Sequence, residues 1–167
     1  MEKTYVGIDI GKLGAIVILY PDGGVKTMYM PLINGEIDYQ DLGNIVAQLV
    51  GLNAHVVFEK LGVIFGSGKS TAFSMGHQSG AVEMACVAHH VPYTKVRAVD
   101  WQKQMFQGVQ EITKTGTKKR DTKAMALIAV KRLFPDLKLT FGDRAKKPHD
   151  GLIDAVLLAE YARRNRL

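Results

Sequence analysis

The sequence predicts an α/β fold built around a mixed β-sheet, and two features of the first third of the chain indicate it. Three apolar, β-branched segments follow one another with short turns between them, which is typical of an antiparallel meander. A predicted helix then separates these strands from a fourth apolar strand, and a helical crossover favours parallel pairing with the first strand. The length of 167 residues suits a single domain, and no second domain is expected.

Turn residues and apolar periodicity place the elements in order along the chain. The meander is expected at residues 4–10, 13–20 and 25–30, followed by a helix that Asp38 caps and that runs over 39–50. A strand at 54–59, a glycine-rich loop at 61–69, a long helix at 70–90 and a short strand at 93–97 come next. The remainder predicts a helix at 98–106, a loop at 107–116, a basic helix at 117–134, a charged linker and a last helix at 148–164.

Composition narrows the class of protein. Hydrophobic residues make up 47% of the chain, which is enough for a packed core and argues against disorder. No apolar run reaches the ~18 residues that a membrane span needs, and the N-terminus lacks the apolar region of a signal peptide. The lone cysteine, Cys86, is expected to be a buried thiol. We therefore expect a cytoplasmic protein without a membrane partner.

Basic charge is concentrated in the middle of the chain. Residues 95–147 carry 14 basic and 5 acidic side chains, whereas residues 1–94 carry 5 basic and 8 acidic ones. Such a segment fits a polyanion such as nucleic acid, although a solvated lysine-rich surface has the same composition.

Four acidic residues stand where buried carboxylates are uncommon. Asp9 lies in the first strand, Glu59 ends the fourth, and Asp150 and Asp154 share one face at the start of the last helix. An unpaired buried carboxylate costs several kcal/mol, so a divalent metal is the simplest group to gather them, and Mg²⁺ prefers such oxygen ligands. Two metals about 3.5–4 Å apart cleave phosphodiesters in many nucleases.

Each of these acids also has a plain structural interpretation. Asp150 can be a helix N-cap, Asp154 a solvated side chain, Glu59 a partner of Lys60 or another cation, and Asp9 a turn acid beside Gly11. His149 is an additional candidate ligand or proton carrier, with a turn histidine as the alternative.

The segment GSGKST at residues 66–71 is close to a phosphate-binding loop, but that motif requires a glycine at position 63, which is Val63. A nucleotide-binding protein stays as one alternative. A contact of Lys69 with the DNA backbone explains the same residues.

Taken in order, these motifs resemble the RuvC family of Holliday junction resolvases in the RNase H-like superfamily. The resemblance covers nearly the whole chain. It rests on the opening GIDIG strand, the VVFE strand, the helix within FSMGHQSGAVEMACVAHH, the lysine-rich stretch and the closing HDGLIDAVLLAEYA. The short, divergent chain suits a phage-borne relative, which would act in the cytoplasm of its host cell.

The resemblance implies a five-stranded mixed sheet with helices on both faces, in a single RNase H-like nuclease domain. It implies a homodimer that resolves four-way DNA junctions by paired nicks, using two Mg²⁺ or Mn²⁺ ions in each active site. The catalytic and metal-binding carboxylates would be Asp9, Glu59, Asp150 and Asp154. The last two ligands are three residues apart in common bacterial members but four apart here, so either Asp150 or His149 would be the fourth ligand.

The resemblance also suggests which residues contact DNA. Lys114, Lys118 and Lys119 resemble basic residues near the scissile phosphate, and Lys119 is an additional catalytic candidate. Phe65 is expected to stack on an unpaired base at the junction centre, or else to be a loop aromatic that packs into the core. The complete set of DNA-binding candidates is Phe65, Lys69, Lys114, Lys118, Lys119 and Arg120.

Two further alternatives stay open. One is an RNase H-like nuclease that acts on other branched DNA or on RNA ends. The other is a junction-binding protein without catalytic activity.

Overall fold

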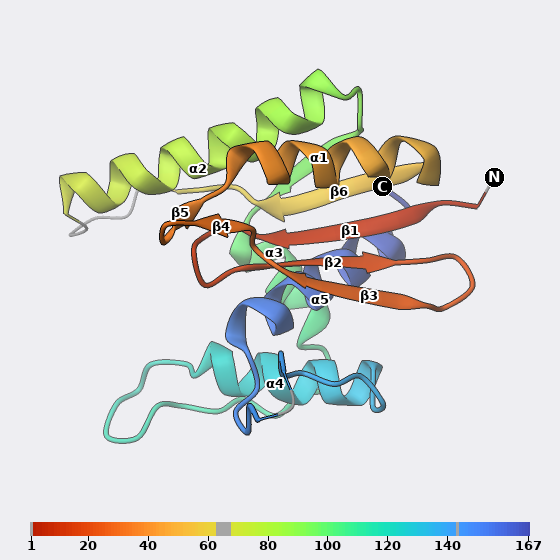
Figure 1. Cartoon of the computed structure of the whole chain (residues 1–167). Coiled ribbons are helices and arrows are strands. Elements are labelled where there is room, and N and C mark those ends of the chain that lie inside the picture. Colours follow the sequence, from red (N-terminus) through yellow and green to blue (C-terminus); the bar gives the residue numbers. More distant parts are fainter. Residues whose placement is uncertain (1, 63–67, 143) are drawn as a thin grey trace.

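A five-stranded mixed sheet lies at the centre of the computed structural model, which describes residues 2–62, 68–142 and 144–167 (Figure 1). The strand order is β3-β2-β1-β6-β7, with β1 antiparallel to β2, β2 antiparallel to β3, and β6 parallel to both β1 and β7. This confirms the predicted meander and the predicted parallel crossover. The strands are β1 (Thr4–Asp9), β2 (Ala15–Leu19), β3 (Val25–Tyr29), β6 (Ala54–Glu59) and β7 (Tyr93–Val96).

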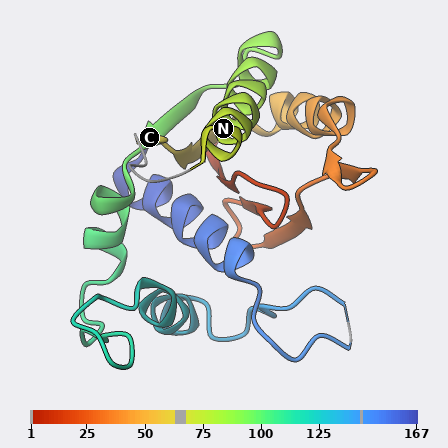
Figure 2. The same cartoon turned by 90° about the vertical axis from the view of Figure 1, so that its left-hand side faces the viewer.

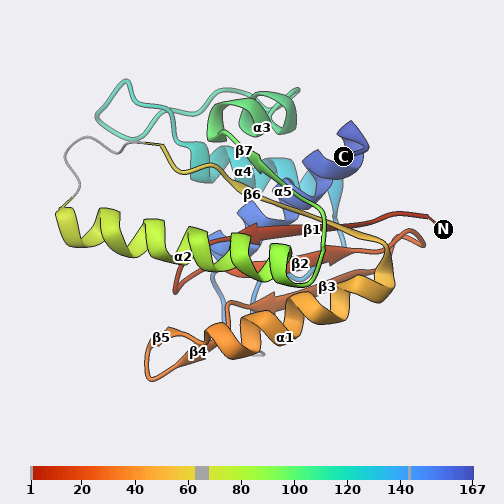
Figure 3. The ribbon, with the colours of Figure 1, turned by 90° about the horizontal axis from the view of Figure 1, so that it is seen from above.

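Helices cover both faces of the sheet (Figures 1 and 3). One face carries α1 (Tyr39–Leu49) and α2 (Lys69–Ala88). A small hairpin of β4 (Leu32–Ile33) and β5 (Glu36–Ile37) precedes α1, and a 3₁₀ turn at Val50–Leu52 connects α1 to β6. The other face carries α3 (Ala98–Met105), α4 (Thr122–Leu133) and α5 (Asp150–Asn165). The predicted fold class, a five-stranded mixed sheet between helices, is therefore confirmed.

Alternation along the strands produces two hydrophobic cores, because successive side chains point to opposite faces of a sheet. Val6 and Ile8 of β1 and Phe58 of β6 pack under α1 and α2, in the core that also contains the buried thiol of Cys86. Tyr5 of β1 and Val57 of β6 face the other core, under α3, α4 and α5. Residues with odd numbers in β1 and β6 therefore face α3, α4 and α5.

Helix α5 lies unusually close to the sheet. A Cβ atom at Gly7 would collide with the backbone carbonyl of Ala155, and one at Gly151 would collide with the carbonyl of Leu13 and lie 2.8 Å from Oδ2 of Asp9. Glycine at these two positions therefore lets the helix rest against β1 beside Asp9.

The helix predicted at 117–134 is the main error in the sequence-based elements. Helix α4 begins at Thr122, where Asp121 is the N-cap and its side chain accepts a hydrogen bond from the Ala124 amide at 3.1 Å. Residues 112–121 instead form a hairpin, held by the Thr113–Arg120 bridge and by the Lys114 amide, which donates to the Lys119 carbonyl at 2.8 Å. We call residues 112–121 the basic hairpin, since it carries Lys114, Lys118, Lys119 and Arg120.

Candidate active site

Asp9 and Glu59 lie side by side at one edge of the sheet. They are the last residues of the parallel strands β1 and β6, and Ile8 pairs with Phe58 in the register immediately before them. Both have odd numbers, so both belong to the face that α3 and α5 cover. Figure 2 shows this end of the molecule, where α5 begins.

Helix α5 brings Asp154 to the same place. Burial raises the pKa of Asp9 to about 7, and the negative charges of Asp154, Glu59 and Asp150 raise it as well. Burial likewise raises the pKa of Asp154 to about 7, with Glu59 and Asp150 adding to the effect. Lys123 is the cation that works in the opposite direction at both groups. A shared negative field of this kind is a frequent property of catalytic carboxylates.

A tryptophan from α3 holds Glu59. The indole Nε1 of Trp101 donates a hydrogen bond to Oε1 of Glu59 over 2.7 Å, and the ring itself is buried. The alternative interpretation of Glu59, as the partner of Lys60 or another cation, gives way to a neutral donor, which orients the carboxylate and leaves its charge in place.

Asp150 and His149 have different roles at the start of α5. His149 is the N-cap, and its Nδ1 accepts a hydrogen bond from the Leu152 amide at 3.1 Å, so the interpretation of Asp150 as the N-cap is wrong. The His149 ring also packs edge-on against Tyr29 and Phe141. Asp150 is the first helical residue, with a half-exposed side chain that pairs with Nζ of Lys123 at 2.5 Å.

Lysines border a pocket of about 430 Å³ beside Asp150. Lys114 of the basic hairpin, Lys123 of α4 and Lys147 line it, together with Asp121 and Asp150. Lys118, Lys119 and Arg120 are exposed on the hairpin rather than on a helix, and Lys69 is exposed at the first residue of α2. Phe65 lies outside the described residues.

The donor set suits a hard divalent cation, since carboxylate oxygens are the ligands that Mg²⁺ and Mn²⁺ prefer. Asp9 and Asp154 are partly buried carboxyls whose charge is disfavoured without a counter-ion, and that observation fits a cation between them. As the side chains stand in residues 2–62, 68–142 and 144–167, no three His, Cys, Asp or Glu groups are close enough to hold a metal ion.

Sequence reasoning missed two residues of this site, Trp101 and Lys123. Their partners are 42 and 27 residues away in the chain, so no local motif joins them. The sequence offered one signal for Trp101, which is the only tryptophan in the chain and does not belong to an apolar run.

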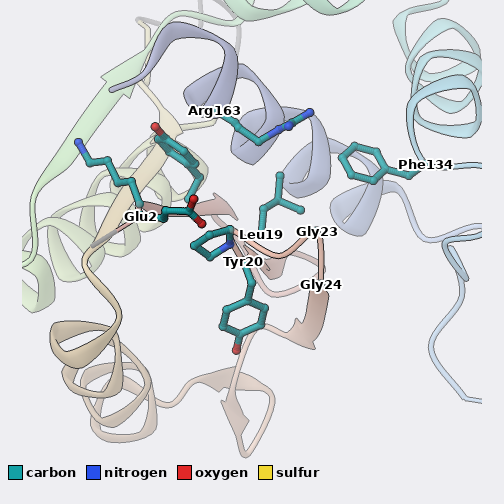
Figure 4. Close-up of a pocket in the computed structure, with 10 residues that line it drawn as sticks. Glu2, Leu19, Tyr20, Gly23, Gly24, Phe134 and Arg163 are labelled. Carbon is teal, nitrogen blue, oxygen red and sulfur yellow. The ribbon is translucent and has the colours of Figure 1, made fainter.

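A separate pocket of about 350 Å³ lies at the opposite end of β1 (Figure 4). Residues from the start of β1, the β2–β3 turn and the end of α5 line it, including Lys3, Tyr20 and Arg163. Arg163 is held there by the buried carboxylate of Glu160, at 2.7 Å. The candidate carboxylates Asp9, Glu59, Asp150 and Asp154 are not among the residues that line this pocket.

Comparison with known proteins gives structural matches but no sequence matches. No protein-family model and no curated protein matches the chain. Among solved structures, Thermus thermophilus RuvC matches with a TM-score of 0.53 and 19% identity over 98% of this chain and 96% of that one. The same protein in complex with a Holliday junction substrate matches with a TM-score of 0.55 and 15% identity, over 97% and 96%.

The yeast mitochondrial Holliday junction resolvase Ydc2 also matches, with a TM-score of 0.55 and 13% identity over 95% of this chain and 77% of that one. At these identities the similarity establishes the fold, so the chain has the RuvC-like form of the RNase H fold. Within the described ranges, no helix is long and apolar enough to cross a membrane.

Proposed function

We propose that the protein is a metal-dependent endonuclease that resolves four-way DNA junctions by paired nicks. The observation that carries the proposal is the meeting of Asp9, Glu59 and Asp154 at one sheet edge, where burial and mutual repulsion raise the pKa of two of them to about 7. The RuvC-like fold supports the choice of substrate, since its structural neighbours include RuvC in complex with a Holliday junction.

Asp9, Glu59 and Asp154 would hold Mg²⁺ or Mn²⁺, with Asp150 as the fourth carboxylate in place of His149, whose Nδ1 is used in capping α5. Bound divalent ions would supply a more acidic water and polarised phosphoryl oxygens for hydrolysis. Trp101 keeps Glu59 oriented toward the site, and Lys123 offsets the charge of Asp150.

The basic side chains would position the DNA. Lys114, Lys123 and Lys147 surround the pocket beside Asp150, where they can contact phosphates next to the cleaved bond. Lys118 and Lys119 are exposed on the same hairpin and would bind the backbone of an adjacent arm. Binding should therefore weaken steeply with salt, because each phosphate contact releases counter-ions.

Paired nicks require two active sites, and α2 offers a surface for a second copy. Phe73, Met84 and Val87 are exposed on α2, and their spacing of 11 and 3 residues places them on one stripe. Gly76 and Gly80 lie on the same stripe, with open space at their missing Cβ atoms. The helix contains two charged residues, Lys69 and Glu83, so this stripe can pack against its own copy about a two-fold axis.

A substrate panel tests the proposal. Wild-type protein would be incubated with an immobile four-way junction, a Y-fork, a linear duplex and an RNA-ended duplex, with and without Mg²⁺ or Mn²⁺. Metal-dependent cleavage confined to the junction is expected. Cleavage of the Y-fork or RNA end alone would indicate another RNase H-like nuclease. Tight junction binding without cleavage in either metal would indicate a binding protein.

A further inference from the structure

A hollow of about 560 Å³ lies between α3 and the basic hairpin. Its apolar part comes from Ala98, Val99 and Phe106, and Val99 is 62% exposed to solvent. Its polar part comes from Gln102, Gln107, Lys103 and Arg120.

Helix α3 separates this hollow from the carboxylates. Trp101 and Met105 are buried on the inner side of the helix, where Trp101 donates to Glu59. Ala98, Val99, Gln102 and Lys103 line the hollow on the outer side. The hollow and Glu59 therefore lie on opposite sides of one helix, whose diameter is roughly 10 Å, so a DNA strand that reaches both must pass around α3.

The basic hairpin connects the two regions. Its Lys114 lines the pocket beside Asp150, and its Arg120 lines the hollow at α3. The bridge to Thr113 fixes the backbone of Arg120, and its guanidinium carbon lies 6.0 Å from the centre of the Phe106 ring. One ordered segment thus supplies a cation to both places.

The chemistry of the hollow matches a nucleotide. Primary amides such as Gln102 and Gln107 form paired hydrogen bonds with base edges, and the Arg120 guanidinium provides a flat surface for a base beside the edge of Phe106, which is 5% exposed. Lys103 and Arg120 can meet the phosphate. No carboxylate is among the described residues that line the hollow. Acids close to the lining residues in the chain have partners of their own: Asp100 binds Arg97 at 2.7 Å, Asp121 caps α4, and Glu111 forms an ion pair with Arg120 at 3.7 Å.

We propose that this hollow binds one nucleotide of the DNA strand that is cut at the carboxylates. The base lies against Val99 and the edge of Phe106, the phosphate contacts Arg120 and Lys103, and the Gln102 amide reads the base edge. Cleavage therefore depends on the identity of a base close to the cut. This inference rests on the proposed nuclease function and goes beyond it, because it assigns a residue to base selection.

Cleavage rates on a set of junctions, each with one changed base within three nucleotides of the cut, test the proposal. The wild type is expected to prefer one base at one position by about tenfold, as a single well-made amide–base pair allows. Gln102→Leu, which keeps the shape without the amide, is expected to abolish that preference at unchanged thermal stability. Gln40→Leu, an exposed glutamine on α1 at the other face of the sheet, is the matched control. A preference that persists in Gln102→Leu, or no preference in the wild type, overturns the assignment.

A second readout does not need cleavage. The photoreactive base 5-iodouracil would be placed at successive positions of a branched DNA, and crosslinked peptides would be identified by mass spectrometry. Crosslinks to residues 98–107 from one or two adjacent positions are expected. Their absence from every position overturns the proposal, even if the protein cuts junctions. Their presence without junction cleavage retains the nucleotide site and rejects the resolvase function.

Discussion

At the residue scale, the defining feature is the pair of partly buried carboxyls of Asp9 and Asp154, which lie in a shared negative field. Burial and neighbouring negative charge both disfavour the ionised forms of Asp9 and Asp154, and Lys123 offsets only part of this effect. Natural proteins keep such groups where chemistry needs them, even when stability suffers. The site should therefore be a local source of instability in the metal-free protein.

That instability gives a pH-dependent prediction. A carboxyl whose pKa is raised from 3.8 to about 7 binds more protons when folded, so its contribution lowers the free energy of unfolding as pH rises from 4 to 7. Asp154→Asn removes this group and should stabilise the metal-free protein at pH 8 by at least about 1 kcal/mol, since one pKa unit corresponds to about 1.4 kcal/mol. Thermal unfolding of the wild type and of Asp154→Asn in EDTA, at pH 8 and pH 5, measures this difference in stability. An equal effect at both pH values would contradict the account.

Trp101 gives a second prediction at this scale. Trp101→Phe keeps an aromatic ring in the core but removes the donor to Glu59, so metal-dependent cleavage should fall about 10- to 100-fold, as for other residues that orient metal ligands. Rates would be measured well below the melting temperature of each variant. Met105→Leu changes the packing at another buried position of α3 without removing a hydrogen bond, and it serves as the control. Full activity in folded Trp101→Phe would show that the hydrogen bond is dispensable.

At the element scale, the site depends on how closely α5 approaches β1. Gly7 and Gly151 remove the two Cβ atoms that would otherwise hold the helix away from the strand. Gly7 is two residues before Asp9, and Gly151 is about one helical turn before Asp154. The contact between α5 and β1 therefore determines where Asp154 lies relative to Asp9.

Gly7→Ala tests the close approach. The added methyl would collide with the Ala155 carbonyl and approach the Ala159 amide at 2.6 Å, so we expect a loss of stability of about 3 kcal/mol. Gly43→Ala in α1, where the added atom meets nothing within 4 Å, should instead stabilise by about 0.5–1 kcal/mol. Chemical denaturation compares them. Similar small changes in both would show that α5 has room to shift.

The sequence predicted elements better than contacts. Strong turns and apolar runs identified the five strands and the parallel crossover, and with them the edge where Asp9 meets Glu59. The apolar stripe of Met125, Ile128, Ala129 and Leu133 predicts a helix over residues 117–134, whereas residues 117–121 belong to the hairpin and Asp121 caps α4. The partners of Glu59 and Asp150 depend on packing between distant elements, so they were not predictable from local patterns.

At the scale of the whole molecule, charge and apolar surface lie on different helices. The basic hairpin and α4 provide the lysines beside the carboxylates, whereas α2 provides an apolar, nearly uncharged stripe on the opposite face of the sheet. A dimer through α2 would leave both basic surfaces free for DNA. Two active sites on one junction would then cut opposed strands together.

The most direct test uses a supercoiled plasmid that extrudes a cruciform, which is a four-way junction in closed-circular DNA. Two nicks made within one encounter convert the plasmid to linear DNA, whereas separate nicks first produce open circles. We predict linear product in Mg²⁺ from the wild type without accumulation of open circles, and no product from Asp154→Asn. Cleavage by Asp154→Asn at the wild-type rate, or no cleavage by the wild type in Mg²⁺ or Mn²⁺, would contradict the proposed active site.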